Sequence, residues 1–208
     1  MPATIIDGTA IANRIKEQVR QQVQAHTEAG RPVYLVAVLV GASPAGELFA
    51  ERQKQACNAV GIEYQLITLP SDSTFEQVSQ TISKLNHDPA VTGIMLHLPL
   101  PPHLDATELQ YRIDPLKDVE GVNPANIGYV VYGHTLIAPF TALAVIELIH
   151  STGVELRGAE VTVVGASQIV GRPIGLLLTQ QMATVTTCHI ATRDLKLQAT
   201  TVTTPLGE

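Results

Sequence analysis

A glycine-containing loop near the end of the chain has the composition of a phosphate-binding turn. The segment Gly165–Gly171 reads GASQIVG, and it lies between a β-branched apolar run at 160–164 and a stretch that predicts a helix over 170–181. Such a loop presents unpaired backbone N–H groups and the positive end of a helix dipole to a pyrophosphate. The spacing is GxSxxxG rather than GxGxxG, so a purely structural strand-to-helix turn is an equally good interpretation.

The strand predicted after this helix, at 183–188, bears on which dinucleotide the loop could take. It runs into His189 and Ile190, and no acidic residue stands at its tip to hold the ribose 2′-hydroxyl of NAD. NADP would instead need a cation close by. Arg172 and Arg193 are candidates, although each could equally be a solvated surface charge.

Strand and helix patterns alternate along the whole chain, which predicts βαβ units and a parallel sheet. Strands are predicted at 33–40, 62–69, 91–98, 160–164 and 183–188, with one more at 199–204. Helices are predicted from Thr9, over 43–60, 73–86, 141–150 and 170–181, and a shorter one within 103–135. Ser43 with Pro44 is typical of a helix start, and Ser73 with Glu76 of a capping box. We place a domain boundary at residue 150, giving domains 1–150 and 151–208.

Composition excludes several classes of protein. The net charge is −6, and the 13 Lys and Arg residues are scattered, so we expect neither a nucleic-acid nor a membrane partner. Cys57 and Cys188 are the only cysteines, which fits a reducing compartment, and we expect both to be small buried hydrophobes. Without a signal-peptide pattern or a long apolar run, the sequence predicts a cytoplasmic protein. The 7 histidines show no metal-ligand spacing, so we expect no metal.

Six ordered motifs carry a resemblance to a known family. They are IIDG at 5–8, LVGASPAGELF at 39–49, GIMLHLPLP at 93–101, KDVEGVNPANIG at 117–128, VVGASQIVGRPIGLLL at 163–178 and ATVTTCH at 183–189. From Ile5 to about Leu195 the chain resembles the bifunctional methylenetetrahydrofolate dehydrogenase/cyclohydrolase family. The resemblance implies an α/β fold, with an N-terminal three-layer α/β domain for folate followed by a truncated Rossmann-like NAD(P)-binding domain.

The resemblance also implies which positions form the catalytic site, and several are substituted here. The family's relay lysine corresponds to Gln53, and the tyrosine one helical turn before it corresponds to Phe49. The family's glutamine before LPLP corresponds to His97, and its pterin-binding aspartate to Glu120. An amide does not titrate near neutral pH, so Gln53 cannot serve as a general acid or base. Arg52 and Lys54 flank it, but each lies about 100° around the helix.

On the cofactor side, the family's arginine and serine that face the NADP 2′-phosphate correspond to Ala166 and Ile190. We therefore expect NADP to bind weakly or not at all. The predicted cofactor-binding positions are Gly165, Ala166, Ser167, Ile169, Gly171, Arg172, His189 and Ile190.

Three hypotheses remain open. The chain is a catalytically impaired family member that binds a folate-like molecule, as a homodimer or as a heterodimer with an intact relative. Alternatively, it is an active NADP-dependent dehydrogenase and cyclohydrolase of one-carbon metabolism, with His97 and Glu120 as relocated acid and base groups. A third alternative is a truncated fragment that acts only as an interaction partner.

Overall fold

The computed structural model describes residues 4–41 and 43–200 of the chain. These residues form two compact units. One unit runs from Thr9 to Asn123, and the other combines the residues before Thr9 with those from Pro124 onward. None of the helices within the described ranges is both long enough and apolar enough to cross a membrane.

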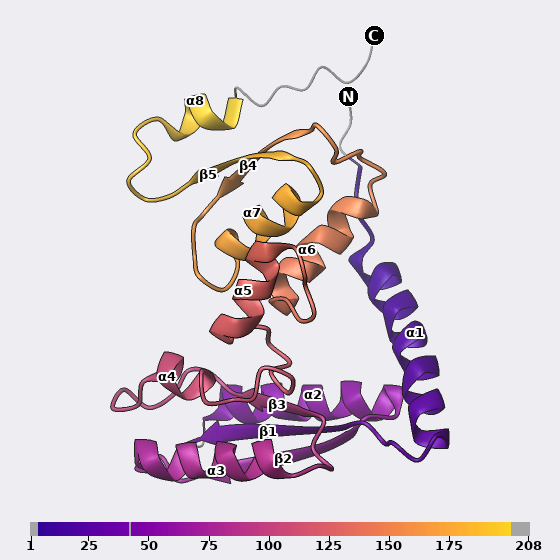
Figure 1. Cartoon of the computed structure of the whole chain (residues 1–208), viewed down its shortest axis with the longest axis vertical. Helices are drawn as coiled ribbons and strands as arrows, with labels where there is room; N and C mark the ends of the chain where they lie inside the picture. Colours follow the sequence, from indigo (N-terminus) through magenta and orange to yellow (C-terminus); the bar gives the residue numbers. More distant parts are fainter. Residues whose placement is uncertain (1–3, 42, 201–208) are drawn as a thin grey trace. The chain divides into compact units, whose positions relative to one another are not determined.

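The Thr9–Asn123 unit is built on a parallel sheet of order β2-β1-β3, with strands Glu63–Leu69, Tyr34–Val40 and Gly93–Leu96. The central strand YLVAVLV is apolar throughout because both of its faces are covered. Helices α2 (Pro44–Val60) and α3 (Phe75–His87) lie on opposite faces of the sheet (Figure 1). The predicted three-layer α/β arrangement is confirmed for this unit.

Alternation along β1 divides the core between the two faces. Val36, Val38 and Val40 pack in one buried cluster with side chains of α3. Leu39 points to the other face, where its Cδ1 lies 3.2 Å from the place that a Cβ on Gly46 of α2 would take. The two-residue repeat of a strand therefore decides which residues α2 meets.

The ends of α2 agree with the sequence prediction, whereas the start of α3 does not. Ser43 caps α2 by accepting a hydrogen bond from the Gly46 N–H at 3.0 Å, and Gly61 ends the helix with φ +83°. The capping box of α3 is formed by Thr74 and Gln77, so its prediction at Ser73 and Glu76 was wrong by one residue. Ser73 is buried, and a residue whose side chain is taken into the core is a poor cap.

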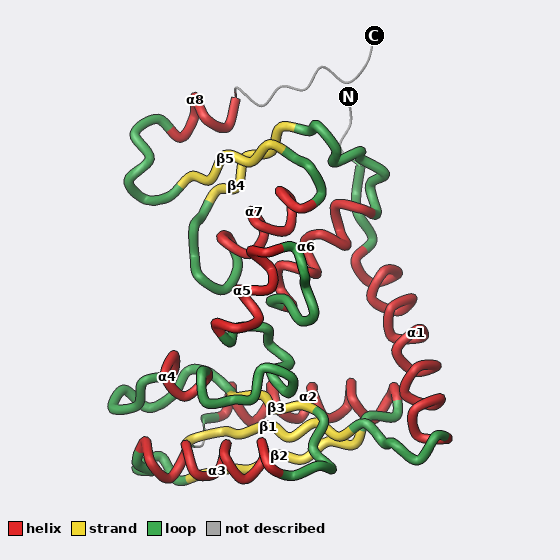
Figure 2. Tube along the Cα trace, viewed as in Figure 1, coloured by secondary structure: helices red, strands yellow, loops and turns green. Residues whose placement is uncertain are grey.

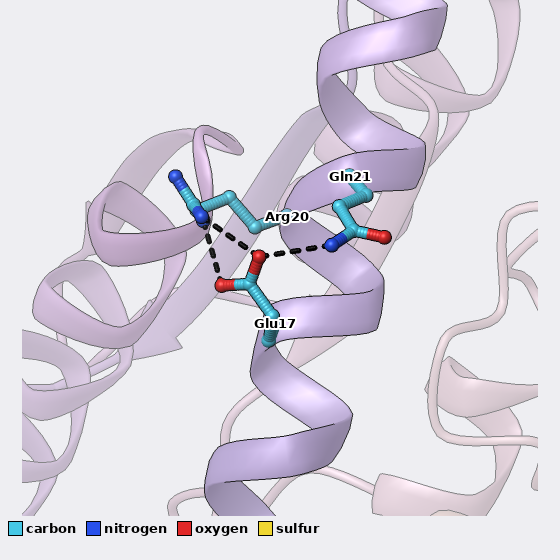
Figure 3. A network of polar contacts seen from close by, with 3 residues as sticks. All are labelled: Glu17, Arg20 and Gln21. Atoms are coloured by element: carbon cyan, nitrogen blue, oxygen red, sulfur yellow. Dashed lines mark hydrogen bonds and ion pairs between the residues drawn. The ribbon is translucent and has the colours of Figure 1, made fainter.

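Helix α1 (Gly8–Glu28) is less buried than its apolar spacing predicts. Of its residues only Val23 is buried. On its exposed surface the Arg20 guanidinium donates two hydrogen bonds to the Glu17 carboxylate, which also accepts one from Gln21 (Figure 3). Exposed pairs of this kind contribute little to stability. Hydrogen bonding from Arg20 nevertheless lowers the pKa of Glu17.

The second unit contains the parallel pair β4 (Glu160–Val164) and β5 (Thr184–Cys188), which lie side by side in Figure 2. Helix α7 (Gly171–Gln180) connects them and shares a buried core with helices α5 (Pro124–Tyr132) and α6 (Phe140–His150). The predicted boundary at residue 150 falls at the end of α6, whereas the compact units divide between Asn123 and Pro124. The assignment of functional domains to 1–150 and 151–208 stays a prediction.

Two further sequence predictions are settled by the described residues. The residues before 201 that were predicted as a strand belong instead to helix α8 (Leu195–Thr200), and 201–204 lie outside the described residues. Helix α4 (Ala106–Gln110) and α5 together take the place of the one short helix expected in 103–135. Cys57 and Cys188 are buried and unpaired, as predicted, and burial raises the pKa of the Cys57 thiol.

Candidate active site

Helix α2 and the end of β3 bring three of the predicted site residues together. Phe49 and Gln53 are four residues apart on α2, so they share one helix face. His97 follows β3 and points to the same side of the sheet as Met95, because strand side chains alternate. The Phe49 and His97 rings meet edge to face, with centroids 5.3 Å apart and planes at 76°. Phe49 is 55% exposed, so a large part of its ring is open to a ligand.

The Gln53 amide is held from both ends. Its Nε2 donates to Met95 Sδ at 2.8 Å, and its Oε1 lies 3.1 Å from His97 Nε2. A thioether sulfur only accepts, which orients the amide. Since the amide oxygen also only accepts, His97 Nε2 must carry the proton in this contact, and Nδ1 is then the acceptor nitrogen.

His97 is only 4% exposed, and its Nδ1 has no hydrogen-bond partner. Burial lowers the pKa of this imidazole, because a charged ring loses its hydration. His97 is therefore a neutral residue at physiological pH, with one ring nitrogen already engaged by Gln53. The other ring nitrogen, Nδ1, is buried and has no partner.

Glu120 reaches the end of β3 through the loop that follows α4. Asp118 forms a parallel bridge with Ile94, and the Ile94 N–H donates to the Lys117 carbonyl at 2.8 Å. The Leu96 backbone acts on the ionisation of the Glu120 carboxyl, so this carboxyl lies near the end of β3. The buried Asp118 carboxylate fixes the turn by accepting the backbone N–H groups of Glu120, Gly121 and Asn123 at 3.2, 3.1 and 2.8 Å.

The Glu120 carboxyl lies in a poorly hydrated position. Burial is the main cause that raises its pKa to about 7, and the nearby Asp118 charge acts in the same direction. The Leu96 backbone and the Gln110 side chain lower the pKa by less than these two causes raise it. Its Oε2 is buried and makes no hydrogen bond. Glu120 therefore changes protonation state close to neutral pH. The predicted pairing of Glu120 with His97 as acid and base stays a prediction.

The positively charged side chains close in sequence to Gln53 or Glu120 do not point to a lysine-like group in this site. Arg52 and Lys54 are both exposed on α2, whereas Gln53 is partly buried. The Lys117 ammonium donates to the carbonyls of Leu85 and Asp88 at 3.0 and 2.7 Å, which ties its loop to the end of α3. Within the described ranges, no group of three or more His, Cys, Asp or Glu side chains is arranged to hold a metal ion.

In the other unit, the glycine loop joins β4 to the start of α7. Gly165 has φ +120°, which favours glycine, and its N–H donates to the Cys188 carbonyl at 2.9 Å. This bond brings the loop next to the end of β5. A Cβ on Gly171 would lie 2.0 Å from the Gly165 oxygen, so this close approach requires glycine. Ser167 Oγ accepts from the Gly171 N–H at 3.2 Å, so Ser167 supports the first turn of α7.

These residues fit the diphosphate part of a dinucleotide better than a 2′-phosphate. The backbone turn and the helix start are present, as a diphosphate requires. Ala166 supplies no charge, and the side chains of Ile169, Arg172 and Ile190 are exposed. His189 Nδ1 accepts the Ala191 N–H at 3.1 Å, so this nitrogen is occupied in closing the turn after β5.

The fold and these two sites define a class: an α/β protein with an N-terminal catalytic domain and a C-terminal NAD(P)-binding domain. Residues 6–120 match the family model of the tetrahydrofolate dehydrogenase/cyclohydrolase catalytic domain, and residues 139–203 match the model of its NAD(P)-binding domain. The chain belongs to the tetrahydrofolate dehydrogenase/cyclohydrolase family.

Similar proteins cover most of this chain. Bifunctional protein FolD 2 of Geobacter sulfurreducens is 44% identical over 193 residues, which are 93% of this chain and 68% of the relative. The crystal structure of the Campylobacter jejuni bifunctional enzyme FolD superimposes with a TM-score of 0.91 at 36% identity, covering 94% of this chain and 70% of that one. The Trypanosoma brucei enzyme, solved with NADP cofactor and an inhibitor, gives a TM-score of 0.84 at 33% identity and covers 93% and 67%.

Two residues of the first site were missed by the sequence reasoning. Met95 orients Gln53, and the alternation along β3 could have placed it on the face of His97. Gln110 lies beside Glu120 although it is buried at the end of α4. A glutamine directly after the buried Leu109 was the available signal, because a buried amide needs partners.

Proposed function

We propose that this chain binds a folate-type ligand at the site of Phe49, Gln53, His97 and Glu120, and that its dehydrogenase and cyclohydrolase turnover is impaired. The observation that carries the proposal is the Gln53 amide, which contacts Met95 and His97 at the position that resembles the family's relay lysine. An amide at this position can orient a ligand but cannot exchange a proton with it near neutral pH.

The remaining side chains support binding better than turnover. The exposed ring of Phe49 offers a stacking surface for a heterocycle. His97 is neutral, is engaged through Nε2 and has a buried Nδ1, so it orients Gln53 and brings no charge to the site. When bound, NADP would supply the hydride acceptor of the family's reaction. The loop from Gly165 to Gly171 would hold its diphosphate, and the absence of a cation at Ala166 supports weak binding.

Turnover tests this proposal directly. The purified chain, incubated with methylenetetrahydrofolate and saturating NADP, should form NADPH far more slowly than the Geobacter sulfurreducens relative in the same assay. Calorimetric titration of the same preparation with folate should nevertheless show binding. Turnover at the relative's rate would contradict impairment, and absence of folate binding would contradict the ligand assignment.

A second candidate function is favoured by Glu120. Its carboxyl has a pKa raised to about 7 and an unpartnered Oε2, which suits a general acid or base near neutral pH. In this case the chain is an active enzyme whose proton transfer runs through Glu120 and His97. His97→Ala should then abolish activity while Gln53→Ala barely changes it. Equal activity of His97→Ala and the unsubstituted chain would count against relocation.

We also propose that the chain works in the cytoplasm, as a homodimer or in a heterodimer with an intact relative. An impaired subunit can still influence an active one through a shared interface. Sedimentation of the chain, alone and mixed with an active relative, distinguishes the two assemblies. A monomer in both experiments would contradict them.

A further inference from the structure

The strands β4 and β5 end at the same edge of their sheet, and two exposed apolar side chains stand at this edge. Because the strands are parallel, Val164 pairs with Cys188 at their carboxyl ends, and the Gly165 N–H donates to the Cys188 carbonyl at 2.9 Å. Val164 is 63% exposed, and Ile190, two residues beyond Cys188, is fully exposed. Open parallel sheets bind their ligands outside this edge. Apolar side chains there suit an uncharged ligand surface, whereas a charged group would lose hydration beside them.

The turn after β5 fixes the position of the proton on the His189 ring. The Ala191 N–H donates to His189 Nδ1 at 3.1 Å, and the His189 backbone N–H donates to Thr192 Oγ1 at 2.9 Å. A ring nitrogen that accepts a hydrogen bond carries no proton, so the proton of this ring is on Nε2. The exposed ring thus offers an uncharged N–H donor just beyond the end of β5. In dinucleotide-binding folds a residue near the end of this second strand contacts the 2′ position of the ribose.

Arg172 and Arg193 are the arginines closest in sequence to the carboxyl ends of β4 and β5. Arg172 is the second residue of α7, Arg193 follows the turn after β5, and both side chains are exposed. A contact between an exposed guanidinium and a phosphate is weakened by solvent and salt. Ala166, in the loop itself, carries no charge. A phosphate monoester carries a charge of about −1.5 to −2 at neutral pH, and these side chains compensate it poorly.

We propose that the dinucleotide site of this chain selects NAD over NADP, and that His189 and Ile190 determine this specificity. The ribose 2′-hydroxyl of NAD is uncharged, and its oxygen can accept the His189 Nε2–H. The 2′-phosphate of NADP would lose hydration beside Ile190, and an uncharged N–H offers it no compensating charge. The inference rests on the proposed binding of a dinucleotide by the loop from Gly165 to Gly171, and it differs from the NADP that the family resemblance implies.

Calorimetric titration of the full chain with each dinucleotide tests the preference without any folate. NAD should bind about tenfold more tightly than NADP at an ionic strength of about 0.15 M. Ile190→Arg should reduce this difference by strengthening NADP binding alone. Thr184→Arg adds the same charge at the opposite end of β5 and should leave the ratio of the two affinities unchanged. Equal affinities in the unsubstituted chain, tighter binding of NADP, or no binding of either dinucleotide would overturn the inference.

Substitution of His189 separates recognition from a structural role. In His189→Asp a carboxylate oxygen can still accept the Ala191 N–H, which preserves the turn. The uncharged donor is replaced by an anion that accepts from a 2′-hydroxyl and repels a phosphate, so the preference for NAD should grow by about a further fivefold. If His189 only closes the turn, the ratio of the two affinities stays the same, and its role in specificity is refuted.

Folate binding is measured in the same preparations. Loss of folate binding with an intact preference for NAD would refute the folate ligand and sustain the dinucleotide assignment. Folate binding without a preference for NAD would refute the dinucleotide assignment alone.

Discussion

The site around Gln53 depends on side chains, whereas the glycine loop around Gly165 depends on the backbone. At the first, the groups that could do chemistry are side chains: the Gln53 amide, the His97 ring and the Glu120 carboxyl. At the second, the part that could hold a ligand is the backbone of the loop between β4 and α7, positioned by the contact of Gly171 with Gly165.

This difference explains why substitutions have different consequences in the two regions. At position 53 an amide cannot take over the role of a titratable side chain, and the backbone cannot supply one. At Ala166 and Ile190 only side-chain contacts to a 2′-phosphate would be affected, while the turn that would hold a diphosphate is formed by backbone. A function carried by side chains is therefore lost more easily than a function carried by backbone.

The sharpest test of the side-chain site is to place a lysine at position 53. Gln53→Lys should raise the rate of NADPH formation about 10²- to 10⁴-fold at saturating NADP, the range typical of a positioned acid or base. Arg52→Lys is the matched control, since it places a lysine one residue away on the exposed surface of α2 and should change nothing. An equal gain in rate in both variants, measured in the same steady-state assay, would show that the gain does not depend on a lysine at position 53.

The dependence of unfolding free energy on pH should show how much the ionised Glu120 carboxylate destabilises the folded chain. Its pKa is about 7 in the folded protein and ordinary in the unfolded one, so the folded state binds more protons between these values. The contribution of Glu120 to stability is then fully present below pH 4.5 and is lost as pH rises through 7. Glu120→Gln should accordingly be more stable than the unsubstituted chain at pH 8, by roughly 3 kcal/mol, but similar at low pH. Urea unfolding at both pH values measures this, and Glu63→Gln on the exposed part of β2 serves as control.

The backbone half of the comparison predicts a strict requirement for glycine at one position. Gly171→Ala should destabilise its unit by roughly 2–3 kcal/mol and weaken NAD and NADP alike, because the new Cβ would meet the Gly165 oxygen. In Gly175→Ala the Cβ would lie 3.5 Å from Thr187 Oγ1, an ordinary contact, so that variant should keep its stability. Thermal unfolding separates the two, and equal melting temperatures would argue against a tight turn.

The smallest expected effect is on NADP affinity and concerns Ala166, which carries no positive charge. Ala166→Arg should raise affinity for NADP about tenfold, because a charged hydrogen bond to the 2′-phosphate is gained on a partly exposed loop. Affinity for NAD, which lacks this phosphate, should stay the same. Gln168→Arg adds the same charge elsewhere in the loop and controls for general attraction. Calorimetry with both dinucleotides decides, and a parallel gain for NAD would refute a 2′-phosphate contact.

Much of the fold follows from local sequence. The strand at 160–164 was predicted with the bounds that the structure gives, because a β-branched run before a glycine loop has few alternatives. The start and end of α2 were predicted from Ser43, Pro44 and Gly61, whose effects on the backbone are local. The capping box was displaced by one residue because local chemistry at Ser73 and Thr74 is nearly the same, and only burial distinguishes them.

The sequence by itself determined the family motifs, the βαβ order and the presence of a non-titrating amide at Gln53. Only the tertiary structure decided that Gln53 contacts Met95 and His97, and that Asp118 pairs with Ile94 and lies close to the Glu120 carboxyl. These contacts join residues far apart in sequence, and burial and Coulomb interactions depend on distances in space. The protonation of Glu120 is therefore a property of the folded chain, which no motif around it encodes.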